Sequence, residues 1–219
     1  DLMKKRYLFI IVIVLLGVIL HFLSVSITPM LKKIATKEID RFCQMVINNT
    51  PFPVELDHQE LIKVNRSGNE ISTINFDTNY ASSIGAKIVN NLDELFVSLE
   101  EGVYKKTDDT FYQRKLEEIS NNGGVIASVP LGMMTDNPFL AEIGPKIEIR
   151  YKTISAITCT VNKEIKSYGV NHVMVSLSLT IKIKMMVLLP FYNEEFNKAY
   201  DYPLVIEIIE GEVPNWYQN

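Results

Sequence analysis

A long apolar run near the start of the chain limits where the rest of the molecule can lie. Residues 7–27 form an almost unbroken series of apolar side chains without a charge, directly after Lys4, Lys5 and Arg6. A helix rises about 1.5 Å per residue, so about 20 such residues cross the ~30 Å hydrocarbon core of a bilayer. We therefore expect one transmembrane helix and one large domain on one side of the membrane.

Two other interpretations of this run stay open. A cleaved signal peptide has an apolar core of about 7–15 residues and then a small-x-small cleavage site, a role that Ser24-Val25-Ser26 could serve. A buried core helix normally has a polar face, and this run has none before Ser24. The length of the run favours the uncleaved anchor.

The basic residues around the run predict its orientation, because Lys and Arg close to a membrane span stay on the cytoplasmic side. The short tail before residue 7 has three basic residues against Asp1 alone, which predicts a cytoplasmic N-terminus and a domain outside. Lys32, Lys33 and Lys37 follow on the other side of the run and weaken this bias.

The remainder of the chain is long enough for one sizeable core. The formal net charge of −4, without a stripe of Lys and Arg between aromatic residues, predicts no nucleic acid partner. The two cysteines, Cys43 and Cys159, lack the spacing of a zinc site. The sequence favours two small buried side chains and leaves one disulfide open.

Helical periodicity indicates two amphipathic helices. Pro29 permits a new helix start or a kink, and an apolar stripe then spans residues 30–47. This stripe favours packing on the domain or on a second copy, with contact to anionic lipid headgroups as the alternative. A second stripe spans residues 80–100, and residues 61–76 predict a β-hairpin with its turn at residues 66–69.

The last third of the chain alternates between apolar and polar residues, as half-buried antiparallel strands do. The alternation spans residues 146–165, 173–189 and 200–209, after a short strand expected at residues 125–130. These runs are longer than a usual strand of about five or six residues, so we expect an extended or bent sheet. Because the helices come mainly before the sheet, the predicted fold class is α+β.

The expected organisation has three parts. Residues 1–28 are the basic head and the single transmembrane helix, and residues 29–50 are an amphipathic juxtamembrane helix. Residues 51–219 are one extracytoplasmic α+β domain, and the fold after the anchor consists of amphipathic helices, a β-hairpin and a long-stranded antiparallel sheet.

No residue pattern predicts a reaction. The chain has no GxSxG elbow, no GK[ST] phosphate loop and no calcium-binding loop, so we expect no catalytic residue, no cofactor and no metal. The segment 131–144, where apolar residues stand among Gly and Pro, is either a folded lid or a contact surface. The C-terminal tail with the single Trp either docks on the domain, which is favoured, or contacts a partner or a glycan. Both segments supply candidate partner contacts. The candidates are Met133, Met134, Phe139, Trp216 and Tyr217.

Short motifs in the same segments carry a family resemblance. They are Val129-Pro130-Leu131-Gly132-Met133, Asn137-Pro138, Gly144-Pro145-Lys146-Ile147, Tyr168-Gly169-Val170-Asn171 and Gly211-Glu212-Val213-Pro214. With the short basic head and one membrane span, the chain resembles the YunB family of sporulation proteins from endospore-forming Firmicutes. The resemblance covers nearly the whole chain and is most specific from Gly124 onward.

The resemblance implies a process and no reaction. It implies a mother-cell protein needed for normal spore formation, located in the membrane around the forespore, with its domain between the two forespore membranes. One function class is a non-enzymatic envelope factor whose partners are the lipid bilayer and other sporulation envelope proteins or a second copy of itself. The other class binds or processes lipid or peptidoglycan precursors. A deep cavity lined by Met133, Met134, Phe139 and the sheet would favour the second class.

Overall fold

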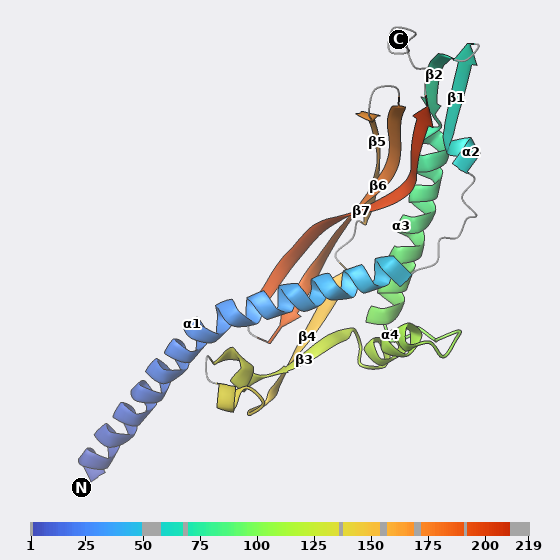
Figure 1. Ribbon diagram of the computed structural model, residues 1–219. Helices are drawn as coiled ribbons and strands as arrows, with labels where there is room; N and C mark the ends of the chain where they lie inside the picture. The colour runs from blue at the N-terminus through green and yellow to red at the C-terminus, as the bar shows by residue number, and fades with distance from the viewer. Residues whose placement is uncertain are drawn as a thin grey trace.

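The computed structural model describes residues 2–49, 58–67, 70–135, 138–153, 157–168, 172–190 and 192–210. Within these ranges, most side chains of residues 2–26 and those of residues 58–59, 66–67 and 70–72 lie outside the described part. The elements, in chain order, are α1 (Leu2–Asn49), α2 (His58–Leu61), β1 (Ile62–Ser67), β2 (Glu70–Phe76), α3 (Thr78–Glu100), α4 (Phe111–Asn121), β3 (Val125–Pro130), the 3-10 turns η1 (Leu131–Met134) and η2 (Pro138–Leu140), β4 (Lys146–Thr153), β5 (Thr158–Tyr168), β6 (His172–Leu189) and β7 (Tyr192–Glu210) (Figure 1). The predicted α+β class is confirmed.

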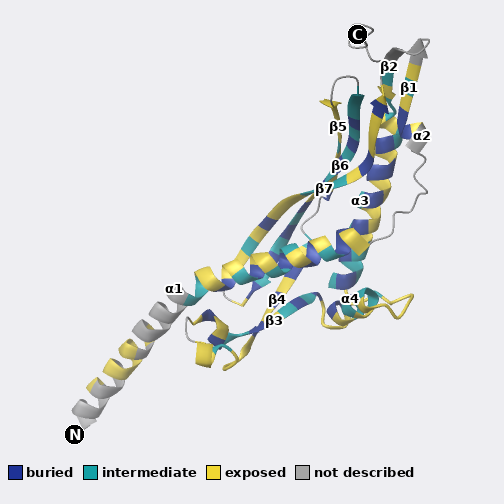
Figure 2. Ribbon diagram, viewed as in Figure 1, coloured by how far each residue is buried: buried dark blue, intermediate teal, exposed yellow. Residues whose placement is uncertain are grey.

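Helix α1 is one continuous element that passes through Pro29. The predicted juxtamembrane helix is therefore the second half of a longer helix and does not start afresh at the proline. In this half, Leu31, Ala35, Ile39 and Phe42 recur every three or four residues and are buried, which confirms a stripe that packs on the domain. Figure 2 shows buried and exposed residues alternating along this half.

Among the described residues, no helix contains a stretch both long and apolar enough to cross a bilayer. The predicted anchor at residues 7–27 falls largely on side chains outside the described part and stays a prediction.

The long strands form one curled antiparallel sheet around β6 (Figure 1). Strand β7 pairs along the whole of β6, while β4 and β5 pair one after the other along its opposite edge. Strand β3 extends the sheet beyond β4. Leu204 is an extra residue in β7, because Val205 pairs with Leu177 and Pro203 pairs with Ser178. Such a bulge bends a strand and accommodates a proline that has no N–H to donate.

The predicted strand boundaries differ from the observed ones at two places. The run at 146–165 is divided into β4 and β5, and β7 begins at Tyr192, eight residues before the predicted run at 200–209. Glu194, Glu195 and Lys198 interrupt the apolar alternation at the start of β7, which hides this half of the strand from a hydropathy pattern.

The other predicted elements are observed. The hairpin of β1 and β2 pairs antiparallel, and α3 covers the predicted helix at 80–100. Asp77 caps α3, because its side chain accepts a hydrogen bond from the backbone N–H of Tyr80 at 2.9 Å. Gly85 lets α3 lie close to the sheet, since a Cβ at this position would lie 2.9 Å from the Sγ of Cys159.

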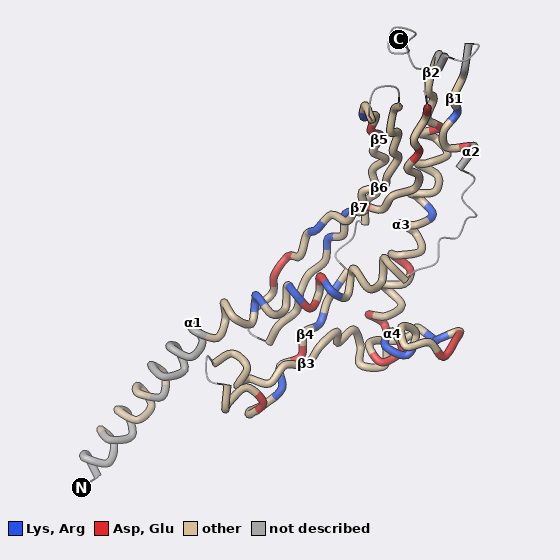
Figure 3. The backbone as a smooth tube through the Cα atoms, in the orientation of Figure 1, with Lys and Arg blue, Asp and Glu red and all other residues tan. Residues whose placement is uncertain are grey.

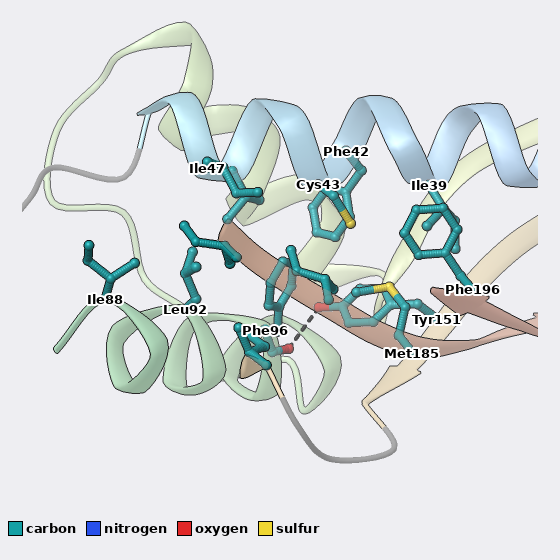
Figure 4. Close-up of a cluster of buried hydrophobic side chains, with 14 of the residues drawn as sticks. Ile39, Phe42, Cys43, Ile47, Ile88, Leu92, Phe96, Tyr151, Met185 and Phe196 are labelled. Carbon is teal, nitrogen blue, oxygen red and sulfur yellow. Dashed lines mark hydrogen bonds between the residues drawn. The ribbon is translucent and has the colours of Figure 1, made fainter. Parts of the chain in front are cut away.

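The core lies where α1, α3 and β4 meet (Figure 4). The ring of Phe42 lies 5.6 Å from that of Phe96 and 5.3 Å from that of Tyr151, between centroids. The hydroxyl of Tyr151 donates a hydrogen bond of 2.7 Å to the backbone carbonyl of Phe96. Burial is the main cause that raises the pKa of Tyr151, so this phenol stays protonated and keeps donating.

Candidate functional site

The segment between β3 and β4 has a backbone held by its own hydrogen bonds. The N–H of Leu131 donates to the carbonyl of Pro145 at 2.9 Å, and the N–H of Gly132 donates to the carbonyl of Ile143 at 2.8 Å. The hydroxyl of Thr135 donates to the carbonyl of Gly132 at 2.7 Å. These bonds hold the two ends of the segment against each other. Backbone hydrogen bonds outside regular helices and strands therefore keep η1 and η2 in place.

Gly132 makes this closure sterically feasible. A Cβ at this position would lie 1.7 Å from the carbonyl oxygen of Leu140 and 2.5 Å from that of Ile143. Any side chain would push the two arms of the segment apart. Gly144 closes the segment with a φ of +105°, which an L residue rarely adopts.

This fixed segment presents apolar side chains to solvent. Phe139 is 90% exposed and Ile143 is 60% exposed, and Leu140 and Met133 are exposed as well. We call Met133, Phe139, Leu140 and Ile143 the loop surface. Helix α1 contacts η1, so the start of the segment between β3 and β4 lies beside α1 (Figure 1). Apolar side chains grouped on a rigid loop are typical of a contact site.

The five predicted contact residues have different positions. Met133 and Phe139 belong to the loop surface, whereas Met134 is only 7% exposed and packs in the core. Adjacent residues of the 3-10 turn point to different sides, which an apolar pattern cannot resolve. Trp216 and Tyr217 lie outside the described residues.

Leu140 and Ile143 were not predicted as contact residues. Both stand between Pro138 and Gly144, so the signal in the sequence was an apolar residue in a segment of helix and strand breakers.

Described residues also line three grooves. The first lies between α1 and β7, with a volume of about 470 Å³. The second lies between α3 and β5, with about 610 Å³, and the third lies between α4 and the strands β3 and β4, with about 290 Å³. None of these three is lined by Met133, Met134 or Phe139, so they are not the cavity that a precursor-binding protein was expected to have.

The groove between α1 and β7 carries paired charges that join distant segments. Lys198 lies 2.6 Å from Asp40, and the hydroxyl of Tyr200 donates to the same carboxylate at 2.8 Å. Burial raises the pKa of Asp40, but the hydrogen bonds from Lys198 and Tyr200 outweigh it, so the pKa is lowered. Lys32 forms a salt bridge with Glu194. Asp40 and Tyr200 are 160 residues apart, and Lys32 and Glu194 are 162 residues apart, so spacing in the sequence cannot indicate these contacts.

Potential metal ligands and thiols are the remaining reactive groups of the described part. No group of three His, Cys, Asp or Glu residues that could hold a metal is found among the described residues. Cys43 and Cys159 are both free thiols. Burial raises the pKa of Cys43 to about 12, so it remains a thiol and packs as a small apolar side chain.

The chain is similar to known sporulation proteins. The family model described as Sporulation protein YunB (Spo_YunB) matches residues 126–216, which include the loop surface and most of the long-stranded sheet. Sporulation protein YunB of Bacillus subtilis (strain 168) is 28% identical over 196 residues, which cover 88% of this chain and 72% of that protein. No solved structure matches the chain.

Proposed function

We propose, from its similarity to the YunB family of sporulation proteins, that the chain is a membrane-anchored, non-enzymatic factor that supports formation of the spore envelope. The domain binds another protein in the space between the two forespore membranes. The chain sits in the mother-cell membrane around the forespore, with its N-terminus in the cytoplasm.

The proposed anchor is the first half of α1. Residues 7–27 have no charge and follow three basic residues. The apolar side chains described between residues 7 and 15 are 52–65% exposed; they are Tyr7, Ile11, Val12, Ile13, Val14 and Leu15. A helix with apolar side chains on all sides needs an apolar environment on all sides, which a bilayer supplies.

The observation that carries the protein-binding role is Phe139, which is 90% exposed on a backbone that hydrogen bonds hold in place. Burying a Phe side chain in a partner contributes about 1.5–3 kcal/mol. Because hydrogen bonds from Ala141 to Pro138 and from Ile143 to Leu140 already hold the backbone around this side chain, little conformational entropy opposes binding. Phe139 and Ile143 would therefore be the anchors of the interface.

The second function class, binding of lipid or peptidoglycan precursors, is supported by a different feature. The groove between α1 and β7 combines lysines with an apolar floor, and it lies directly after the proposed anchor.

The protein-binding role is tested by photo-crosslinking in sporulating cells. With a photoreactive amino acid at position 139, we expect a crosslink to one discrete protein partner. The Phe139→Ser, Ile143→Ser double variant should lower the yield of heat-resistant spores about tenfold or more at unchanged protein level, because two interface anchors are lost.

The matched control is Ile206→Ser, Ile208→Ser, which removes two exposed apolar side chains from β7. This control should leave spore yield unchanged. No crosslink at position 139, together with equal spore yields for both double variants, would reject the loop surface as the contact. A Gly132→Ala variant is a second test of the loop surface, because it displaces the loop without changing its exposed side chains.

A further inference from the structure

The groove between α1 and β7 combines cationic side chains with an apolar floor. On α1 it is lined by residues between Pro29 and Asp40, and on β7 by Phe196 and Lys198. Phe196 is buried and forms the floor, while Lys32, Lys33, Lys37 and Lys198 stand around it. Figure 3 shows the charged residues of α1 and β7 on neighbouring segments.

The charges of this groove do not balance. Its four lysines face two carboxylates, because Lys32 pairs with Glu194 and Lys198 pairs with Asp40. The lowered pKa of Asp40 keeps that carboxylate ionised and committed to Lys198. The pairs therefore neutralise two of the lysines.

Lys33 and Lys37 are the two lysines left over. Within the part of the chain that the structure describes, neither has a carboxylate within 4 Å, and the nearby Glu38 pairs with Arg41 at 3.4 Å. They stand four residues apart on one helix, where side chains are neighbours and like charges repel. An anion between the two ammonium groups would relieve this repulsion and accept hydrogen bonds from both.

The groove lies at the height of lipid headgroups if residues 7–27 span the membrane. Lys33 and Lys37 follow Ile27 by about 9 and 15 Å along the helix axis. Each Cα–Cβ bond of a helix tilts toward the N-terminus, so both side chains extend back toward the membrane surface. The headgroup layer adds roughly 5–8 Å to each side of the hydrocarbon core, which long lysine side chains on this turn can reach.

We propose that this groove binds the phosphate of an anionic phospholipid in the leaflet next to the domain. Lys33 and Lys37 donate to the phosphate oxygens, and the glycerol and first methylene groups lie against Pro29 and Phe196. The apolar floor makes a lipid a better occupant than a free phosphate ion. The inference rests on the proposed anchor, which sets the groove at the membrane surface.

The test uses the full-length chain in an uncharged detergent and native mass spectrometry with added phosphatidylglycerol or phosphatidylcholine. We expect phosphatidylglycerol to bind about tenfold more tightly, and the Lys33→Gln, Lys37→Gln double variant to lose this preference. The matched control is Lys87→Gln, Lys163→Gln, which removes the same charge from exposed lysines of α3 and β5. The control should keep the preference.

Two results would overturn the inference. The first is a preference for phosphatidylglycerol that persists in the double variant or disappears equally in the control. The second is competition by inorganic phosphate at a concentration as low as that of the lipid, which would assign the groove to a free anion.

Carbonate extraction of membranes tests separately whether residues 7–27 anchor the chain. A chain that carbonate releases, but that prefers phosphatidylglycerol through Lys33 and Lys37, would reject the anchor and keep the lipid site.

Discussion

The two halves of α1 belong to one helix but have different surroundings. In the first half, the described side chains from Ile11 to Leu15 are apolar and exposed on successive residues, so every side of the helix is apolar. In the second half, only the stripe through Leu31, Ala35 and Ile39 is apolar and buried, while lysines occupy the other side. A helix with one apolar stripe can bury that stripe against one protein surface, whereas one such surface cannot cover a helix that is apolar on all sides.

The continuity of the helix gives this difference a consequence. Since α1 passes through Pro29 without ending, its first half continues directly into the half that packs on the domain. Any surface that holds the first half therefore also sets the direction of the sheet that packs on the second half. Variants placed in the two halves should separate folding from membrane attachment.

We expect the largest effect on stability when the Phe42 side chain is removed from the second half. Phe42→Ala leaves a cavity against the rings of Phe96 and Tyr151 and should lower the free energy of unfolding by about 3–5 kcal/mol. Val12→Ala in the first half should change it by less than about 0.5 kcal/mol. Urea unfolding of both variants in detergent, followed by near-UV circular dichroism, measures the difference. Equal effects would mean that both halves contribute to one core.

A lysine in the first half should act on membrane attachment instead. Val14→Lys places a charge near the middle of residues 7–27, where a lysine costs about 2.5–3.5 kcal/mol of insertion. We expect a larger fraction of the protein to be released by carbonate extraction, with the unfolding midpoint of the domain unchanged. Asn48→Lys, on the exposed side of the second half, should change neither quantity. Release that is the same for wild type and Val14→Lys would argue against the anchor.

Local periodicity explains which elements were predictable from the sequence. Helix α3, the β1–β2 hairpin and the alternation of β6 depend on neighbours within one turn or one strand, and all three were predicted. The first part of β7 was missed because Glu194 and Lys198 find partners on α1, so charged side chains occupy an ordered strand.

The candidate site was predictable in composition but not in orientation. Met133 and Phe139 were expected from apolar residues among breakers, and both are exposed. The burial of Met134 and the close approach at Gly132 depend on how the segment folds back on itself, which no spacing records. The contacts between α1 and β7 are likewise set by packing between segments far apart in the sequence.

The smallest expected effect concerns the polar contact that the second half of α1 makes with β7. Because the pKa of Asp40 is lowered in the folded state, its ionised form stabilises the fold above the unfolded value of about 3.9. This contribution is lost as the pH falls through the lower folded pKa. Since Lys198 is partly exposed, we expect Asp40→Asn to cost less than about 1 kcal/mol at neutral pH.

Urea unfolding of wild type and Asp40→Asn at several pH values measures this contribution. The difference between the two proteins should be constant above pH 5 and should shrink progressively in more acidic solution, because protonated Asp40 and Asn are both neutral. A difference that stays constant into acid would show that the side chain acts through its hydrogen bond with Tyr200 and not through its charge. In that case the second half of α1 would be held to the sheet by packing and neutral hydrogen bonds, and its contrast with the first half would be one of shape alone.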